Sequence, residues 1–418
     1  MFSTIFLPLV FIVAVLVRLI KRNPKRKPRL VWGSVPIINN SLWSKAMRKA
    51  GYSSETFTTN YFSTINKRED WDRILGEEYK MAPSFLKAFL AFSESLFRYD
   101  VFFVSANGFF LGSTNLCFLQ AQFLKLAGKK IVLLPYGADS YVYRRIRSCS
   151  VAHALLISYP EASKAQKAIA RQVDYWVKYA DAVVPAGMGV DGFGRWDVLI
   201  PNSLALDIKE WLSSDRSNKA NGTDGKVVIT HAPNHRGFKG TEFVLAAVKK
   251  LQEQGLEVEL KLLEKIQNDE VRRILHEETD ILVEQLIFSG HGMNAIEGMA
   301  SGLPTISNLE DENSLLPMRR WSFFRECPLV SATPENLIDV LHKLVTRPQL
   351  REDLGRASRE YVEKYHDLDS ADYLFSNVIE FIYGRKPSLM NLYHPLLGEY
   401  PNGSDKIKHP LVDNKILD

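Results

Sequence analysis

Short runs of apolar residues alternate along this chain with segments of helical periodicity, and this alternation restricts its possible folds more than any other feature. A strand that is covered on both faces reads as an uninterrupted apolar run, so the pattern indicates buried parallel sheets with helices on both sides. The chain is therefore predicted to be an α/β protein with two tandem Rossmann-like, doubly wound domains. The expected strands are residues 29–32, 101–105, 131–135, 182–185, 198–201, 227–230, 258–263, 281–283 and 304–307.

The length and the polar segments predict where the domains lie. At about 100–200 residues per domain, a chain of 418 residues suggests two or three domains. Segment 213–225 (SSDRSNKANGTDG) is polar and has no periodicity, so it is predicted to link a first domain, 29–212, to a second, 226–384. The Pro- and Asn-rich residues 385–418 are expected to form a tail.

The amino-terminal residues combine an apolar run with a basic cluster. Residues 2–20 (FSTIFLPLVFIVAVLVRLI) are about as many as the roughly 20 that a helix needs to cross a bilayer. Basic residues follow the run and no cleavage site does, which argues against a signal peptide. Residues 1–21 are expected to be a single-pass or monotopic membrane helix, and 22–28 a juxtamembrane segment on anionic lipid at the cytoplasmic face of the cell membrane. A buried hairpin or an interfacial helix stays open, because Pro8 interrupts the run.

Cysteine usage and charge exclude several classes of protein. The three cysteines are far apart and lack CxxC spacing, which argues against a disulfide scaffold or a zinc site and fits a reducing cytosol. The net charge of +5 arises from seven basic residues between Arg18 and Arg29, because the rest of the chain carries −2. So local a patch is not typical of a nucleic-acid-binding protein, and no nucleic acid is expected as a partner.

Two cations occupy a glycine-containing turn after an expected strand of the second domain. Arg236 and Lys239 lie in the segment HAPNHRGFKG, just before a predicted helix. An arginine fork, a lysine charge and the free N–H groups of a helix start together suit a phosphate. Ordinary solvated loop cations are the alternative interpretation. His231 and His235 flank the turn and are candidates for hydrogen bonds to the same ligand, although strand-end histidines are more often structural.

A second glycine-containing segment, SGHGMNAIEGMASGLP, lies at another junction between a strand and a helix. Gly290 and Gly292 let a ligand approach the backbone where the helix begins. Glu297 lies five residues further, roughly 7.5 Å along the helix axis, where its carboxylate can accept hydrogen bonds from two vicinal hydroxyls. Surface exposure is the usual fate of a glutamate, but the apolar neighbours of Glu297 indicate a mostly buried helix.

Together these segments resemble the donor domain of GT-B glycosyltransferases, in particular the retaining family-4-like group. The resemblance rests on the Arg–Lys turn, the glutamate helix with its trailing Gly-Leu-Pro, and the closing helices at 333–383. It covers roughly residues 30–384 and is stronger in the second half. It implies a nucleotide-sugar donor, most often a UDP- or GDP-sugar, and no other required cofactor. The residues assigned to the donor are Arg236, Lys239, His231, Gly290, Gly292, Met293, Glu297, Ser289 and Glu284.

The resemblance also implies roles for these residues. Arg236 and Lys239 would stabilise the leaving diphosphate together with the helix start, and Glu297 would bind the ribose hydroxyls. Ser289 stands where the family has a further glutamate, and Glu284 is a candidate for lining the sugar pocket. No metal is expected, because no DxD-like pair follows a strand.

In the first domain the resemblance points to the acceptor side of the reaction. The segment Tyr-Gly-Ala-Asp at 136–139 follows a strand, where the family often has His-Gly-Ser-Asp. Asp139 would act with the two cations as a third catalytic residue by orienting a hydroxyl, and capping a helix is an equal alternative. The residues expected to line the acceptor cleft are Asn107, Gly108, Tyr136 and Gly137.

These features predict a membrane-anchored retaining glycosyltransferase that moves a sugar from a nucleotide donor to a lipid-linked or cell-envelope glycan acceptor. Its expected partners are the nucleotide sugar, that acceptor and membrane lipid. Two alternatives stay open. A sugar-nucleotide epimerase shares the two-domain architecture, and a non-catalytic GT-B-like partner in a glycan-assembly complex would tolerate the departures at Ser289 and Tyr136.

Overall fold

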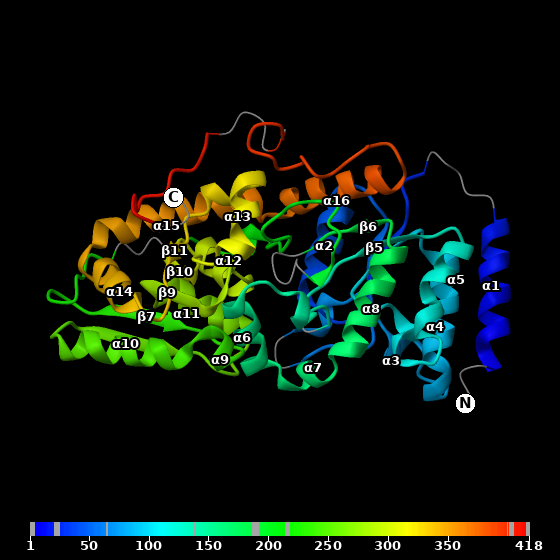
Figure 1. The fold of residues 1–418 in the computed structure, drawn as a ribbon, viewed down its shortest axis with the longest axis horizontal. Coiled ribbons are helices and arrows are strands. Elements are labelled where there is room, and N and C mark those ends of the chain that lie inside the picture. Colours follow the sequence, from blue (N-terminus) through cyan, green and yellow to red (C-terminus); the bar gives the residue numbers. More distant parts are fainter. Residues whose placement is uncertain are drawn as a thin grey trace. The chain divides into compact units, whose positions relative to one another are not determined.

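The computed structural model describes residues 5–20, 26–63, 66–137, 139–185, 192–213, 218–398, 400 and 405–414. The chain forms two units that are interleaved along the sequence. The predicted linker lies among the residues of the second unit. Each unit contains one parallel sheet with packed helices, which confirms the predicted α/β fold with two Rossmann-like sheets (Figure 1). Unit 1 contains Met1–Val142, Ala165–Val198 and Ala371–Met390, and unit 2 contains Tyr143–Lys164, Leu199–Ser370 and Asn391–Asp418.

Unit 1 is built on a six-stranded sheet with the order β3-β2-β1-β4-β5-β6, in which every pairing is parallel. Its central strands are almost wholly buried, as an uninterrupted apolar sequence requires. Trp32 of β1 stacks on Phe103 of β4 with ring centroids 3.7 Å apart, and Phe375 meets both rings edge-on. The strands are β1 (Leu30–Ser34), β2 (Ser54–Thr58), β3 (Arg73–Ile74), β4 (Val101–Val104), β5 (Lys130–Leu133) and β6 (Ala182–Val183).

The helices of unit 1 add apolar faces to its core. In α4 (Ser84–Arg98), for example, Phe89, Phe92 and Leu96 are spaced three and four residues apart and are buried together. The last helix, α16 (Leu368–Ile382), begins in unit 2 and continues into unit 1, where it carries Phe375. The other helices are α1 (Leu7–Leu19), α2 (Ile38–Lys49), α3 (Leu75–Glu78), α5 (Gln120–Leu126) and α8 (Gln166–Tyr179).

Unit 2 has a five-stranded parallel sheet with the order β11-β10-β9-β7-β8. The edge strand β8 is only partly buried, whereas β7 and β9 form its centre. The strands are β7 (Val227–His231), β8 (Val258–Leu262), β9 (Ile281–Ser289), β10 (Thr305–Asn308) and β11 (Val330–Ser331). The helices are α6 (Cys149–Ser158), α7 (Pro160–Lys164), α9 (Arg236–Lys239), α10 (Thr241–Glu253), α11 (Asn268–Glu277), α12 (Met293–Ala300), α13 (Glu312–Trp321), α14 (Leu337–Thr346) and α15 (Pro348–Tyr365).

Three predicted elements differ from the structure. The amphipathic pattern of residues 114–127 and the glycine that follows predict one long helix ending at 127. In the structure this stretch is interrupted, because the Thr114 hydroxyl donates to the Leu111 carbonyl and accepts from the Leu116 amide. Two 3-10 turns (Phe110–Ser113 and Cys117–Leu119) precede the short α5. The strand expected at 198–201 is irregular chain. The strand expected at 281–283 extends to Ser289 as β9, so it carries Glu284 and Gln285 inside the sheet.

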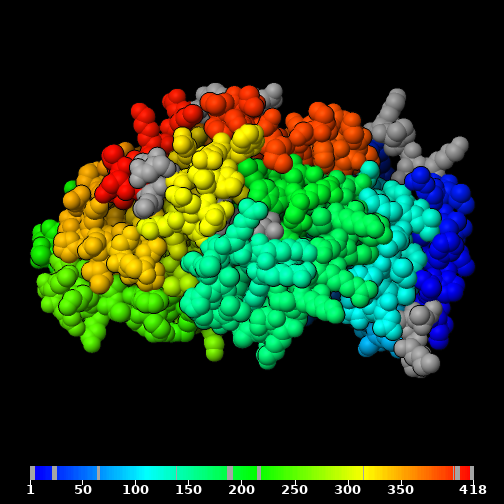
Figure 2. Space-filling view, in the orientation of Figure 1, coloured from blue at the N-terminus to red at the C-terminus, as the bar shows by residue number. Residues whose placement is uncertain are grey.

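The amino-terminal run forms α1, which is shorter than the predicted 1–21. Its residues Val10, Ala14 and Val17 are buried in the core of unit 1, where α1 packs on α4 and α5. Figure 2 shows α1 (dark blue) as an outer layer beside these helices (cyan). No helix among the described residues is long and apolar enough to cross a membrane. Residues 1–4 and 21–25, which include most of the basic segment predicted at 22–28, lie outside the described residues.

Candidate functional site

His231 ends β7 at the carboxyl edge of the unit 2 sheet and is fully buried. Its Nδ1 lies 2.7 Å from the carbonyl oxygen of Val283 on β9, and its Nε2 lies 2.9 Å from the Thr241 hydroxyl at the start of α10. Burial lowers the pKa of His231 to about 4, so the ring is neutral at physiological pH. Both ring nitrogens therefore serve to join two strands and a helix. Its predicted contact with the donor stays a prediction.

Arg236 and Lys239 share the single-turn helix α9, but their surroundings differ. Arg236 is exposed, and its guanidinium pairs with Glu242 at 2.7 Å and with Glu264, just after β8, at 2.9 Å. Lys239 is buried, and its Nζ lies 2.9 Å from both Glu284 Oε1 and Gln285 Oε1. The sequence predicted the same role for both cations, but in the structure Arg236 is a surface charge and Lys239 belongs to a buried ion pair.

Glu284 is the carboxylate around which this edge of unit 2 is organised. Its side chain on β9 is fully buried. Oε1 accepts hydrogen bonds from the Lys239 ammonium and from the Gly292 amide at 2.9 Å each, and the Ser307 hydroxyl donates to Oε2 at 3.4 Å. Gly292 is the N-cap of α12, where free amides and the helix dipole attract an anion. Glu284 therefore fills the anion-binding position that the sequence assigned to a phosphate.

Glycine is required twice where β9 turns into α12. Gly290 has φ of +94°, a conformation that side chains disfavour. A Cβ on Gly292 would lie 3.0 Å from Glu284 Oε1, so glycine allows the carboxylate to reach the amide. Met293 then begins α12. The three predicted residues are thus brought to one helix start.

Glu297 is buried on α12 beside two asparagine amides. Nδ2 of Asn268, the first residue of α11, donates to Oε1 at 3.1 Å, and Nδ2 of Asn294 donates to Oε2 at 3.5 Å. Burial raises the pKa of Glu297 to about 7, although both amides act in the opposite direction. The Oδ1 atoms of both asparagines are buried and have no hydrogen-bond partner among the described residues. Sequence reasoning missed Asn268, because its distance along the chain gives no sign that α11 meets α12.

Two more polar side chains are unsatisfied at the end of β9. Ser289 and His291 are buried, and within the described part of the chain Ser289 Oγ and His291 Nε2 have no hydrogen-bond partner. Burial lowers the pKa of His291 to about 4, so its ring is neutral. Buried polar atoms without partners are rare in folded proteins and are typical of sites that a ligand or water completes.

In unit 1, Asp139 holds together the loops that follow β4 and β5. Its Oδ2 accepts a hydrogen bond from the Ala106 amide at 2.9 Å, and its Oδ1 accepts one from the Gly137 amide at 3.1 Å. Burial raises the pKa of Asp139 to about 7. The loops also meet where Asn107 Nδ2 donates to the Tyr136 hydroxyl at 3.0 Å. Gly108 (φ +79°) completes the set, so the predicted acceptor-side residues do lie together.

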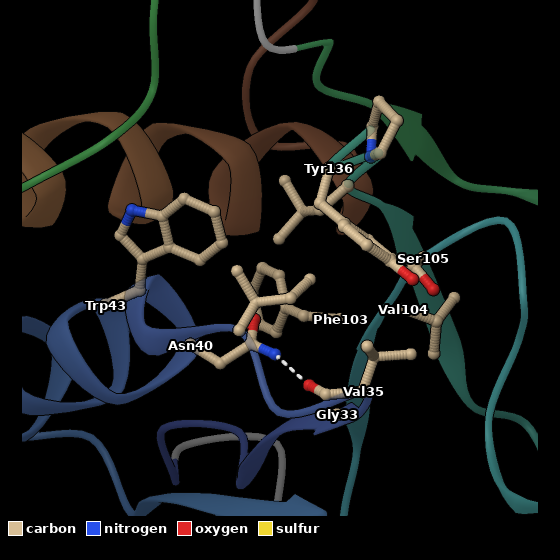
Figure 3. A pocket seen from close by; sticks show the side chains of 11 residues that line it. Gly33, Val35, Asn40, Trp43, Phe103, Val104, Ser105 and Tyr136 are labelled. Atoms are coloured by element: carbon tan, nitrogen blue, oxygen red, sulfur yellow. Dashed lines mark hydrogen bonds between the residues drawn. The ribbon is translucent and has the colours of Figure 1, made fainter. Parts of the chain in front are cut away.

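A small hollow opens beside these loops at the carboxyl ends of β1, β4 and β5 (Figure 3). Tyr136 and Ser105 line one side, and Asn40 and Trp43 of α2 line another. Asn40 donates to the Val35 carbonyl at 3.0 Å and so fixes the loop that follows β1. The sequence did not place Asn40 or Trp43 in the acceptor cleft. The other lining residues are Gly33, Val35, Ile37, Phe103, Val104, Leu134 and Pro135.

Among the described residues, no three His, Cys, Asp or Glu side chains gather closely enough to hold a metal ion. The expectation of metal-independent chemistry stays a prediction.

Two parallel-sheet Rossmann-like units, each with polar groups at the carboxyl ends of its strands, match the GT-B class of fold. The crystal structure of Anabaena HepE in complex with UDP-glucose is similar, with a TM-score of 0.54 and 13% identity, over 85% of this chain and 100% of HepE. The complex of HepE with UDP gives 0.52 and 13% over the same shares. At this identity the likeness concerns the fold alone. No protein-family model and no curated protein matches the sequence.

Proposed function

We propose that this protein is a retaining glycosyltransferase that moves a sugar from a nucleotide-sugar donor to a lipid-linked or cell-envelope glycan acceptor at the cytoplasmic face of the cell membrane. The observation that carries the proposal is the start of α12. There the buried Lys239 ammonium and the Gly292 amide converge on one carboxylate, and the same helix carries a second buried glutamate, Glu297, whose asparagine neighbours have amide oxygens without partners among the described residues. HepE, which has the same fold, is described with UDP-glucose and with UDP, and UDP-sugars are therefore the first donors to test.

When the donor binds, the Glu284 carboxylate would turn toward the transferred sugar, and an oxygen of the diphosphate would take the place that this carboxylate now fills. The Lys239 ammonium and the Gly292 amide converge on one carboxylate oxygen at 2.9 Å each. When the bond between the sugar and the phosphate breaks, negative charge grows on the leaving diphosphate. A fixed cation and a helix start stabilise that charge without moving, which lowers the barrier to transfer. Arg236, exposed and able to turn away from its two glutamates, supplies a second charge.

Glu297 is suited to the ribose of the nucleotide. Its carboxylate keeps accepting capacity, and its two neighbours, Asn268 and Asn294, offer amide oxygens that have no partner in the part of the chain that the structure describes. Vicinal hydroxyls would donate to Glu297 and satisfy these buried groups at the same time. The family's further glutamate is absent at Ser289, and Glu284 is the carboxylate that approaches the same helix start. It is therefore our candidate for contacting the transferred sugar.

The acceptor is assigned to unit 1. Tyr136 and Asn107 present polar groups at the hollow and its adjoining loop. Both oxygens of Asp139 are held by backbone amides, so Asp139 acts by positioning that loop rather than by touching the acceptor. In the reaction the acceptor hydroxyl forms the new bond to the anomeric carbon, and its proton leaves with the nucleoside diphosphate.

Calorimetry with UDP, GDP, ADP and their glucose conjugates tests the donor assignment, with CMP sugars as a further class. We expect one nucleotide diphosphate to bind with a micromolar Kd and the variant Arg236→Ala to weaken it about tenfold. Arg236 is the better first target because its removal leaves no buried charge, unlike removal of Lys239. Absence of binding by every nucleotide would favour the non-catalytic partner. Turnover of the sugar nucleotide to its epimer without an acceptor would favour the epimerase.

A further inference from the structure

Helix α1 has two apolar faces, and only one of them is used inside the protein. The inner face is buried against α4 and α5. On the opposite side the side chains are spaced alternately four and three residues apart, so they form a continuous stripe along the helix. Each of them is between 51% and 72% exposed: Ile5, Leu9, Ile12, Leu16 and Leu19. A soluble surface rarely leaves such a stripe uncovered.

The stripe continues onto the neighbouring helix. Phe6 stacks on Phe89 with ring centroids 4.6 Å apart and lies 6.4 Å from the ring of Phe85. Phe85, in the first turn of α4, is itself more than half exposed, and so is Met81 just before that helix. The apolar surface is therefore shared by two helices of unit 1 that pack on each other, and its position does not depend on α1 alone.

The amino-terminal part of the sequence, which contains α1, carries charges of a single sign. No Asp or Glu occurs before Glu55, whereas seven Lys and Arg lie between Arg18 and Arg29. Arg18 is the last-turn cation of α1, and its guanidinium lies close to Gly128 after α5. An apolar helix followed directly in the sequence by a run of cations complements a bilayer with anionic headgroups, in which apolar side chains enter the acyl region and cations meet phosphates.

We propose that α1 lies in the plane of an anionic membrane interface, with its outer stripe and Phe85 inserted and its inner face still packed on α4 and α5. The bilayer is the occupant of this surface, and the helix serves as a monotopic anchor rather than as a span. The inference rests on the proposed function for its purpose, because it would hold the acceptor hollow of unit 1 at the surface where a lipid-linked acceptor lies. Its test needs no nucleotide.

Vesicle flotation of the full chain measures the proposed contact. We compare vesicles of phosphatidylcholine alone with vesicles that contain 30% phosphatidylglycerol, and the variant Leu9→Ser/Ile12→Ser/Leu16→Ser with wild type. Wild type is expected to float with the anionic vesicles, and the triple variant to partition at least about tenfold more weakly. The control, Leu212→Ser/Leu396→Ser/Val412→Ser, removes three apolar residues of unit 2 that are even more exposed than those of α1, and it should float like wild type.

The orientation is tested by the depth of a label. An environment-sensitive fluorophore on Leu9→Cys or Leu19→Cys, in a Cys117→Ser/Cys149→Ser background, should report the same shallow depth at both positions. Different depths at the two positions would overturn the in-plane arrangement. Failure of wild type to float, or equal flotation of the triple variant, would overturn membrane contact. A wild-type dimer that the triple variant converts to a monomer, with no change in flotation, would assign the stripe to a second copy. If wild type binds a nucleotide but does not float, the membrane inference fails and the proposed glycosyltransferase function is unaffected.

Discussion

Asp139 in unit 1 and Glu297 in unit 2 are both buried carboxyl groups, and burial raises the pKa of each to about 7. Their partners differ. Asp139 accepts hydrogen bonds from backbone amides of two loops, whereas the hydrogen bonds that the Glu297 carboxylate accepts from the described residues come from the side-chain amides of two asparagines. A carboxyl group saturated by backbone serves to shape a loop, and one with spare capacity among unsatisfied neighbours is available to a ligand. Similar pKa shifts therefore do not imply similar roles.

Lys239, like Glu297, is proposed to contact the donor, but its ion pair with Glu284 also stabilises the fold. Replacing it by methionine leaves Glu284 buried without its cation, and we expect the free energy of unfolding to fall by about 3–5 kcal/mol. Urea denaturation measures the loss. The double variant Lys239→Met/Glu284→Gln should recover most of the stability but none of the donor binding. Recovery of both would show that the pair is structural only.

Removing Glu297 separates its role from that of Asp139. Glu297→Ala deletes two charge-assisted hydrogen bonds to the donor, so donor affinity should fall about 100-fold, which corresponds to about 3 kcal/mol. Calorimetry measures the affinity, and Glu253→Ala on the exposed face of α10 is the control. Unchanged affinity in the Glu297 variant would place the ribose elsewhere.

Removing Asp139 should lower the stability of the fold and leave donor affinity nearly unchanged, the reverse of the effect on affinity expected for Glu297. Asp139→Ala leaves the Ala106 and Gly137 amides without their acceptor, and we expect a loss of about 1–3 kcal/mol in the free energy of unfolding. Urea denaturation reports this loss, while calorimetry should find donor affinity within twofold of wild type. A large loss of affinity with normal stability would contradict the positioning role.

The pH dependence of donor binding provides the smallest and most specific test. Ribose hydroxyls donate to ionised Glu297, whose pKa is about 7, so affinity should rise as pH increases through 7. Between pH 7 and pH 6 it should fall by about fivefold, because the carboxyl must lose its proton to bind. The probe is an intact nucleotide sugar, whose diphosphate is esterified at both ends and therefore does not titrate in this pH range. The profile of Glu297→Gln should be flat, and a slope that persists there would assign the titration to another group.

Much of the fold could be predicted because it depends on local pattern. Apolar runs such as VFFV at 101–104 can be buried on both faces only in a parallel sheet, and they form β4 in its centre. The interruption before α5 could not be predicted, since it depends on how the Thr114 hydroxyl competes for backbone groups. The apolar run at the amino terminus was recognised, but its division into an inner and an outer face required α4 and α5.

By itself the sequence determined the strand-to-helix junctions and the residue types at them: Gly292 before a helix, Glu297 within it, and Arg236 with Lys239 on a turn. Only the tertiary structure decided that Lys239 is buried against Glu284, that Arg236 is exposed, and that Asn268 reaches Glu297. The physical reason is that chain spacing controls which side chains share an element. Burial and charge pairing depend on which elements pack together, and residues 29 positions apart reveal this only when α11 and α12 meet.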